Sequence, residues 1–163
     1  MKNLSLPPKL NREIETLILE LKKVYSGDLI SIALYGSAAS GEFISSNSNL
    51  NLLILLKSTS LTDLKKSSNI VKKYKNLTPL FLTEEFIASS SDTFPIEFLD
   101  MQENYQILYG KDIIKDIRVD LKNLRFQCEQ ELKIKLLNLK RIYLEMSNRP
   151  ADLRIPLFKS FNS

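Results

Sequence analysis

Three short apolar runs predict the strands of one small sheet. They are 29–35 (LISIALY), 50–56 (LNLLILL) and 77–82 (LTPLFL), and each has the length and composition of a buried strand. Gly36 and Ser37 follow the first run directly, and residues 45–48 (SSNS) precede the second. These residue types predict a sharp turn after the first strand and a polar loop before the second.

Hydrophobic residues spaced by three and four positions predict helices between and beside these strands. The first helix begins after Pro7 and Pro8 and stops before Gly27. The second begins at Ser60 or Thr62 and runs to about residue 74. Its start has the spacing of a capping box, with Asp63 in the place of the usual glutamate.

A long helix is predicted from about residue 119 to 146, where it would extend about 40 Å. It is longer than the small sheet is expected to cover, so we expect part of it to meet a second copy, a helical partner or sequence beyond this chain. Cys128 falls in its apolar stripe and is interpreted as a small core residue. The stripe consists of Leu121, Leu124, Cys128, Leu132, Leu136, Leu139, Tyr143 and Met146.

The segment between the third strand and the long helix is apolar with interspersed acids. Glu84 and Glu85 are interpreted as first-turn residues of a short helix, where they complement the helix dipole. Residues 94–110 are expected to be largely buried, and Gly110 ends them. For Glu97 and Asp100, a surface position is favoured over a position at a functional site.

Composition excludes several kinds of chemistry. The chain has one cysteine and no histidine, which rules out an internal disulfide, a Ser-His-Asp triad and a Cys-His dyad, and argues against a zinc site. No apolar run is long enough to cross a bilayer, and the first residues lack a signal-peptide pattern, so a cytoplasmic location is expected. The net charge of +4 comes from a basic C-terminal third, but interleaved acids indicate a solvated helix face, and nucleic acid is an unlikely partner.

The candidate site lies where the first two predicted strands meet. Gly36 permits a sharp turn and the close approach of a phosphate, and Ser37 opens a helical turn with free N–H groups. Asn49 and Asn51 are two residues apart, so in a strand their amides project from one face, toward that turn.

This ordered set resembles the nucleotidyltransferase superfamily, which has the polymerase-β-like fold. The hallmark of that superfamily is a strand, a Gly-Ser turn, a second glycine and then an Asp-x-Asp pair opening the next strand. Gly36, Ser37 and Gly41 match it, but Asn49 and Asn51 stand in the place of the two aspartates. The segments TPLFLTEEF, FPIEFLDMQENYQILYG and LRFQCEQELKIKLLNLKRIYLE resemble a group of uncharacterised bacterial nucleotidyltransferase-domain proteins, which extends the resemblance over most of residues 10–147.

The resemblance implies an α+β fold, with a small mixed sheet flanked by helices and a long C-terminal helix. It divides the chain into a nucleotidyltransferase-like domain, 1–117, and a C-terminal helix with its tail, 118–163. It also implies a nucleoside triphosphate as ligand, bound by Gly36, Ser37, Gly41 and Ser48. Two amides provide no charge for Mg²⁺, and residues 77–82 contain no acid that would provide a third ligand.

Three functions remain open on this reading. The favoured one is a nucleotide-binding or regulatory pseudoenzyme with a degenerate metal site and no required cofactor. The first alternative is an active Mg²⁺-dependent enzyme that moves a nucleoside monophosphate onto a hydroxyl of a small molecule or protein, with acid supplied by Glu42, Glu97 or Asp100. The second alternative is a scaffold that associates through the 119–146 stripe and keeps only a vestigial pocket.

Overall fold

The computed structural model of the chain describes residues 6–40 and 49–145. The chain forms two compact units, Met1–Val119 and Asp120–Ser163, and each is described by itself. The first unit contains all the strands described, and the second contains the long helix. The predicted domains, 1–117 and 118–163, stay a prediction, because compactness does not establish that either part folds alone.

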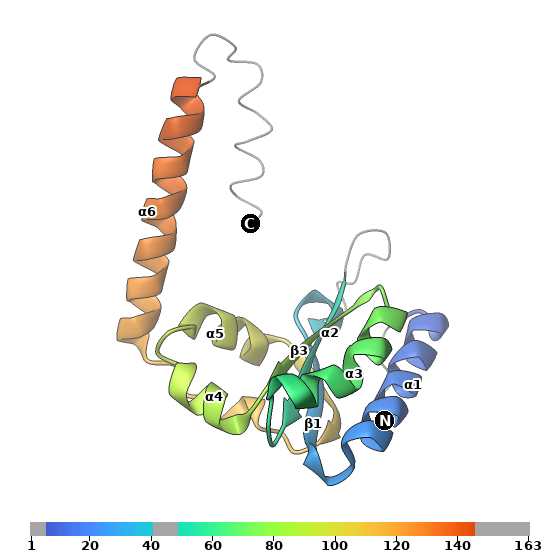
Figure 1. Cartoon of the computed structure of the whole chain (residues 1–163). Coiled ribbons are helices and arrows are strands. Elements are labelled where there is room, and N and C mark those ends of the chain that lie inside the picture. Colours follow the sequence, from blue (N-terminus) through green and yellow to red (C-terminus); the bar gives the residue numbers. More distant parts are fainter. Residues whose placement is uncertain (1–5, 41–48, 146–163) are drawn as a thin grey trace. The chain divides into compact units, whose positions relative to one another are not determined.

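The first unit is built on a four-stranded mixed sheet with the strand order β3-β2-β1-β4 (Figure 1). Strand β1 (Leu29–Tyr35) pairs antiparallel with both β2 (Leu50–Leu56) and β4 (Tyr105–Gly110), whereas β2 pairs parallel with β3 (Leu77–Leu82). The three predicted strands are confirmed at their predicted bounds, and the α+β class is confirmed with them. The fourth strand was not predicted, because Asn104 alone separates it from the preceding helix and no turn pattern marks its start.

One face of the sheet is covered by α1 (Pro8–Tyr25) and α3 (Leu61–Lys73). Alternate residues of β2 point into this core, which is why they are fully buried. The predicted first helix is therefore present, and Tyr25 closes its buried stripe, whereas Val24 is 37% exposed. The buried residues of this core in α1 and β2 are Leu10, Ile14, Leu17, Ile18, Leu21, Tyr25, Leu50, Leu52, Ile54 and Leu56.

The opposite face is covered by α4 (Glu84–Ser90), α5 (Pro95–Glu103) and the short 3-10 helix η2 (Ile114–Asp116). Figure 1 shows α4 and α5 on the other side of the sheet from α1 and α3. The smaller residues of β1 and β2 pack here with apolar residues from the helices. This second core contains Ala33, Leu53, Leu55, Ile87, Phe98, Met101, Ile114 and Ile117.

The start of α3 is capped as its sequence predicts. Ser60 is the N-cap, and its hydroxyl accepts a hydrogen bond of 3.2 Å from the backbone N–H of Asp63. The Asp63 carboxylate accepts hydrogen bonds from the hydroxyls of Ser58 and Ser60, each at 2.7 Å, and one from Lys66 Nζ, also at 2.7 Å. The helix is tied to α1 by Tyr25, whose hydroxyl lies 2.9 Å from Ser67 Oγ and 3.0 Å from the Asp63 carbonyl oxygen.

In the second unit, α6 (Leu121–Glu145) confirms the predicted long helix, but not its single apolar stripe. Four further apolar residues lie on this helix outside the predicted stripe. With a rotation of about 100° per residue, they fall on the side of the helix opposite that stripe. Cys128 is exposed, so its assignment to a core is wrong for the described part of the chain. No residue of α6 is buried, and the second apolar set is Phe126, Ile134, Leu137 and Leu144.

Among the described residues, no helix has both the length and the apolar character needed to span a membrane.

Candidate functional site

The predicted turn lies at the end of the inner strand β1, beside β2. Tyr35, the last residue of β1, pairs with Asn51 of β2. Gly36 follows with a φ of +77°, a conformation that a residue with a Cβ rarely adopts. A Cβ added at Gly36 would stand 3.5 Å from Asn51 Nδ2, so this side-chain amide lies directly beside the turn.

Backbone contacts hold the turn on both sides. The Gly36 N–H donates a hydrogen bond of 2.9 Å to the carbonyl oxygen of Asn104, the residue before β4. The Gly36 carbonyl oxygen accepts from the N–H of Ala39 at 2.8 Å, at the start of the short helix α2 (Ser37–Ser40). The predicted helical turn after Gly36 is therefore present, and Ser37 is exposed on it.

The structure brings together only part of the predicted site. Asn51 is half-buried beside Gly36, and Asn49 is exposed just before β2 begins. Gly41 and Ser48 lie outside the described residues, as does Glu42. The nucleotide-binding roles of Gly36, Ser37, Gly41 and Ser48 stay predictions.

The face that Asn51 occupies is set by the alternation of β2. Leu50 and Leu52 point into the core under α1 and α3, while Leu53 and Leu55 point to the side of α4 and α5. Because side chains alternate along a strand, Asn51 shares the face of Leu53 and Leu55. Any ligand that touches both Gly36 and Asn51 therefore lies on the α4–α5 side of the sheet.

The two strands that meet at this rim, β2 and β3, contain no acidic residue. The amide of Asn51 offers a neutral oxygen, and β3 beside it contains no acid. Hard divalent cations in proteins are held mainly by anionic oxygens. In the described ranges 6–40 and 49–145, no group of three or more Asp, Glu, His or Cys residues is placed to hold a metal ion.

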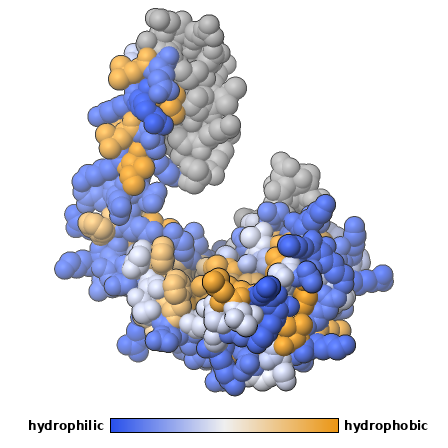
Figure 2. All heavy atoms as spheres, viewed as in Figure 1, coloured by the Kyte–Doolittle hydropathy of each residue, from blue (hydrophilic) through white to orange (hydrophobic). Residues whose placement is uncertain are grey.

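A cavity of about 390 Å³ opens on the same face, between β3, α4 and α5, and is named here the β3–α5 cavity. Tyr35 lines it, and since Tyr35 pairs with Asn51, the cavity adjoins the rim described above. Figure 2 shows hydrophobic side chains gathered between these elements. The apolar and aromatic lining is formed by Tyr35, Leu80, Leu82, Phe86, Phe94, Phe98 and Met101.

Among the described residues of that lining, Glu97 and Asp100 are charged. The sequence favours a surface position for them, and both are exposed, yet they also face the cavity. Their spacing along α5 was the available signal, because residues three apart share one side of a helix. The cavity itself was missed, because Phe86 and Phe94 are distant in sequence from Tyr35 and no pattern joins them.

The Tyr35 hydroxyl belongs to a partly apolar environment. Burial raises the pKa of Tyr35 above its ordinary value, since the charged phenolate is poorly solvated there. Tyr35 is therefore a neutral phenol at physiological pH, able to donate a hydrogen bond on the cavity side of the sheet.

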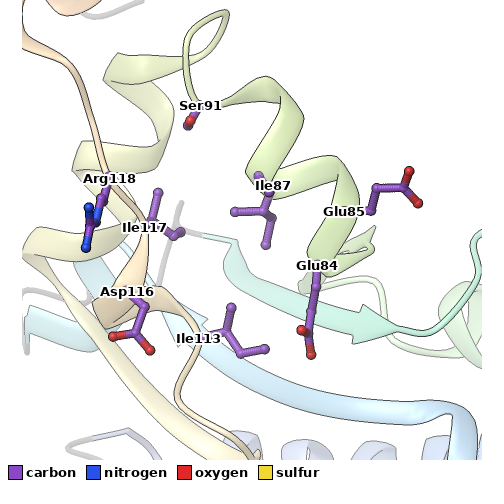
Figure 3. A pocket seen from close by; sticks show the side chains of 9 residues that line it. Glu84, Glu85, Ile87, Ser91, Ile113, Asp116, Ile117 and Arg118 are labelled. Atoms are coloured by element: carbon purple, nitrogen blue, oxygen red, sulfur yellow. The ribbon is translucent and has the colours of Figure 1, made fainter.

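A second cavity of about 540 Å³ lies between α4 and η2 (Figure 3). Glu84 and Glu85 belong to the first turn of α4, as predicted, and both line this cavity. Figure 3 shows Glu85 pointing away from Asp116, with Ile113 between Glu84 and Asp116. These exposed acids and Arg118 form no compact constellation, and the two cavities have no lining residue in common.

No protein-family model matches the chain, and no curated protein matches it in sequence. The solved structure of spectinomycin adenyltransferase AAD(9) from Enterococcus faecialis, with ATP and spectinomycin, matches 85% of this chain and 71% of that chain. The TM-score is 0.59 at 9% sequence identity, a likeness of fold without a close relationship in sequence.

Two toxin–antitoxin structures are also similar, one with AMP-PNP and one of the tri-AMPylated Shewanella oneidensis HEPN toxin with the MNT antitoxin. They match 78% and 81% of this chain and 98% of each matched chain, at 12% and 10% identity. Their TM-scores of 0.43 and 0.42 are too low to support a further argument. The sheet order, the Gly36 turn beside β2 and the likeness to the adenyltransferase together establish that this chain has the polymerase-β-like nucleotidyltransferase fold.

Proposed function

We propose that the chain is a nucleotide-binding or regulatory protein of the nucleotidyltransferase fold that lacks metal-dependent transfer activity. The observation that carries this proposal is the position of the Asn51 amide, directly beside the positive-φ turn at Gly36. The resemblance puts an aspartate at that position, so the fold keeps the turn and replaces the charge.

Electrostatics favours binding over catalysis at this rim. Two unit charges of opposite sign that lie 4 Å apart attract each other by about 4 kcal/mol at an effective dielectric constant of about 20. Replacing a carboxylate with an amide removes an attraction of this order for each charge on the cation. A barrier raised by about 4 kcal/mol slows a reaction roughly a thousandfold, so a transfer that needed such a cation would be strongly impaired.

The remaining groups favour a weak, metal-independent interaction with phosphate. An asparagine amide donates two N–H groups, and a glycine lets a phosphate oxygen approach the backbone closely. The adenyltransferase structure of similar fold contains ATP, which makes ATP the first ligand to test here.

The alternative of an active transferase is favoured by one observation. Glu97 and Asp100 line the β3–α5 cavity, which also contains Tyr35, the pairing partner of Asn51. If they contribute oxygen ligands once a metal–nucleotide complex binds, nucleotide affinity will depend strongly on Mg²⁺.

A titration of the wild-type protein with ATP, GTP, CTP and UTP, with and without Mg²⁺, separates these two functions. Isothermal calorimetry measures affinity, and a coupled assay measures pyrophosphate release. The proposal expects weak binding of at least one nucleotide that Mg²⁺ does not strengthen, with no pyrophosphate above the protein-free rate. Tight binding that requires Mg²⁺, together with pyrophosphate release, would establish the alternative.

Association through α6 is a separate proposal about partners. Large apolar side chains lie on two opposite sides of this helix, and they include Leu132 at 68% exposure and Leu137 at 64%. A second copy of the chain is the simplest partner for such a surface. Light scattering across a range of concentrations tests it: self-association is expected, and a monomer at every concentration would contradict it.

A further inference from the structure

We propose that the β3–α5 cavity binds a small organic cation, in which a primary amine is attached to an aromatic or aliphatic body. This goes beyond nucleotide binding and does not depend on it, because the argument uses only the walls and charges of the cavity. The ligand would lie beside the Gly36–Asn51 rim, since Tyr35 is common to both.

The apolar part of the argument rests on three side chains from different elements. Leu80 of β3, Phe86 of α4 and Phe94 at the N-cap of α5 are exposed by 38%, 42% and 41%, and all three line this one cavity. Single exposed hydrophobic residues are ordinary on protein surfaces, but their convergence on one concavity is typical of a ligand site. An aromatic or aliphatic body bound there would remove this surface from water.

The charge of the cavity lining favours apolar ligands that carry a positive charge over those that carry a negative charge. Glu97 and Asp100, one helical turn apart on α5, both contribute carboxylates, and the lining residues within 6–40 and 49–145 include no basic side chain. A carboxylate at a partly apolar wall, such as that of Asp100, attracts a cation and repels an anion. The triphosphate of a nucleotide is therefore a poor occupant, and an amine is a good one.

The size of the cavity limits the ligand to a small molecule. A volume of about 390 Å³ falls in the range of small-molecule pockets. A two-ring aromatic amine fits this space, whereas a long peptide or a folded partner does not.

The test compares three probes that have the same naphthalene ring and differ in charge: 1-naphthylmethylamine, 1-naphthalenemethanol and 1-naphthoic acid. The chain has no tryptophan, so naphthalene fluorescence and its anisotropy report binding to the full chain with little protein background. The amine is expected to bind about tenfold more tightly than the acid, with the alcohol in between. Equal affinities, tighter binding of the acid, or no binding of the amine would overturn the proposal.

Charge-neutralising variants then locate the site. The double variant Glu97→Gln/Asp100→Asn is expected to weaken amine binding about three- to tenfold and leave alcohol binding nearly unchanged. The single variant Asp100→Asn gives a smaller loss and guards against a folding defect in the double variant. The matched control is Glu84→Gln/Glu85→Gln, which removes two exposed carboxylates from the other cavity and should leave amine affinity unchanged.

Phe94→Ala completes the set by removing apolar wall without changing charge. It is expected to weaken the amine and the alcohol by similar factors. If the control weakens amine binding as much as the double variant, the attraction is a property of the whole surface, and the proposal fails. All of these measurements are made without nucleotide. Their outcome therefore does not depend on whether the nucleotide titrations detect binding.

Discussion

The backbone turn at Gly36 lies against the side-chain amide of Asn51, with 3.5 Å between Nδ2 and the place a Cβ at residue 36 would occupy. Gly36→Val is expected to lower both the stability of the fold and the affinity for nucleotide. A β-branched residue at a φ of +77° costs about 1–3 kcal/mol of stability, and its methyl groups would displace the Asn51 amide. Chemical denaturation and ATP calorimetry measure the two effects.

The matched control for that change is Gly27→Val. Nothing lies within 4 Å of a Cβ at Gly27, so both nucleotide affinity and stability should change little. If Gly36→Val folds and binds ATP like the wild type, the turn has no part in nucleotide binding. That result would favour association through α6 as the function.

Asn49→Asp together with Asn51→Asp is expected to create affinity for divalent cations. Two carboxylates at the rim restore the anionic oxygens that Mg²⁺ requires, and they gain most when a nucleotide supplies further oxygens. Mn²⁺ binding followed by electron paramagnetic resonance, with ATP present, measures the gain.

A pair of surface changes with the same charge, Asn69→Asp and Asn138→Asp, serves as the control, because both residues are exposed and belong to the helices α3 and α6 rather than to the strands at the rim. An equal gain in the control would show that overall charge, and not the rim, attracts the metal. No gain in either variant would count against the nucleotidyltransferase-like geometry of the rim.

Gly110→Ala is expected to destabilise the sheet severely. Gly110 has a φ of +79°, and a Cβ there would come 2.0 Å from the backbone carbonyl oxygen of Ile30. Because backbone rather than a flexible side chain blocks the space, we expect a loss of at least about 2–4 kcal/mol in the free energy of unfolding. Urea denaturation of Gly110→Ala beside Gly27→Ala measures it, and similar midpoints for the two variants would contradict the clash.

The cap of α3 predicts a pH dependence. Hydrogen bonds from Lys66, Ser58 and Ser60 hold the pKa of the Asp63 carboxyl well below its ordinary value. A lowered pKa means that the folded state favours the carboxylate, so its stabilising effect is present at neutral pH. This effect disappears as the pH falls below the ordinary aspartate range.

Asp63→Asn should therefore lower the melting temperature at neutral pH, and the difference from wild type should shrink as the pH falls. Thermal melts followed by circular dichroism between neutral and acidic pH measure this. A difference that stays constant with pH would mean that the carboxylate charge does not stabilise the cap.

The sequence predicts the parts of this fold that depend on local pattern. The strands Leu29–Tyr35 and Leu50–Leu56 are nearly continuous apolar runs, and their burial on both sides explains why the pattern is so clear. Leu77–Leu82 lies at an edge of the sheet and is buried only in part, but its run of apolar residues is still of strand length. Strand β4 lacks such a signal, since its residues are only half-buried at the edge of the sheet.

At the candidate site, too, the sequence predicts local features but not the contacts between distant residues. The Gly36 turn is a local feature, but its contact with Asn51 depends on the pairing of β1 with β2. The β3–α5 cavity combines residues that are up to 66 positions apart, from Tyr35 to Met101, and no periodicity joins them. For Cys128, helical spacing identifies a shared stripe but not whether other residues cover it.

The parallel register of β2 and β3 has a consequence for protein engineering. Thr78 is level with Asn51 in that register, and it is exposed. An aspartate introduced at residue 78 would meet water rather than a packed interior, so the fold can tolerate it at little cost in stability. Added to Asn49→Asp and Asn51→Asp, Thr78→Asp would place three carboxylates at neighbouring positions in β3 and in or directly before β2, the number of acidic groups from which a designer could build a cation site.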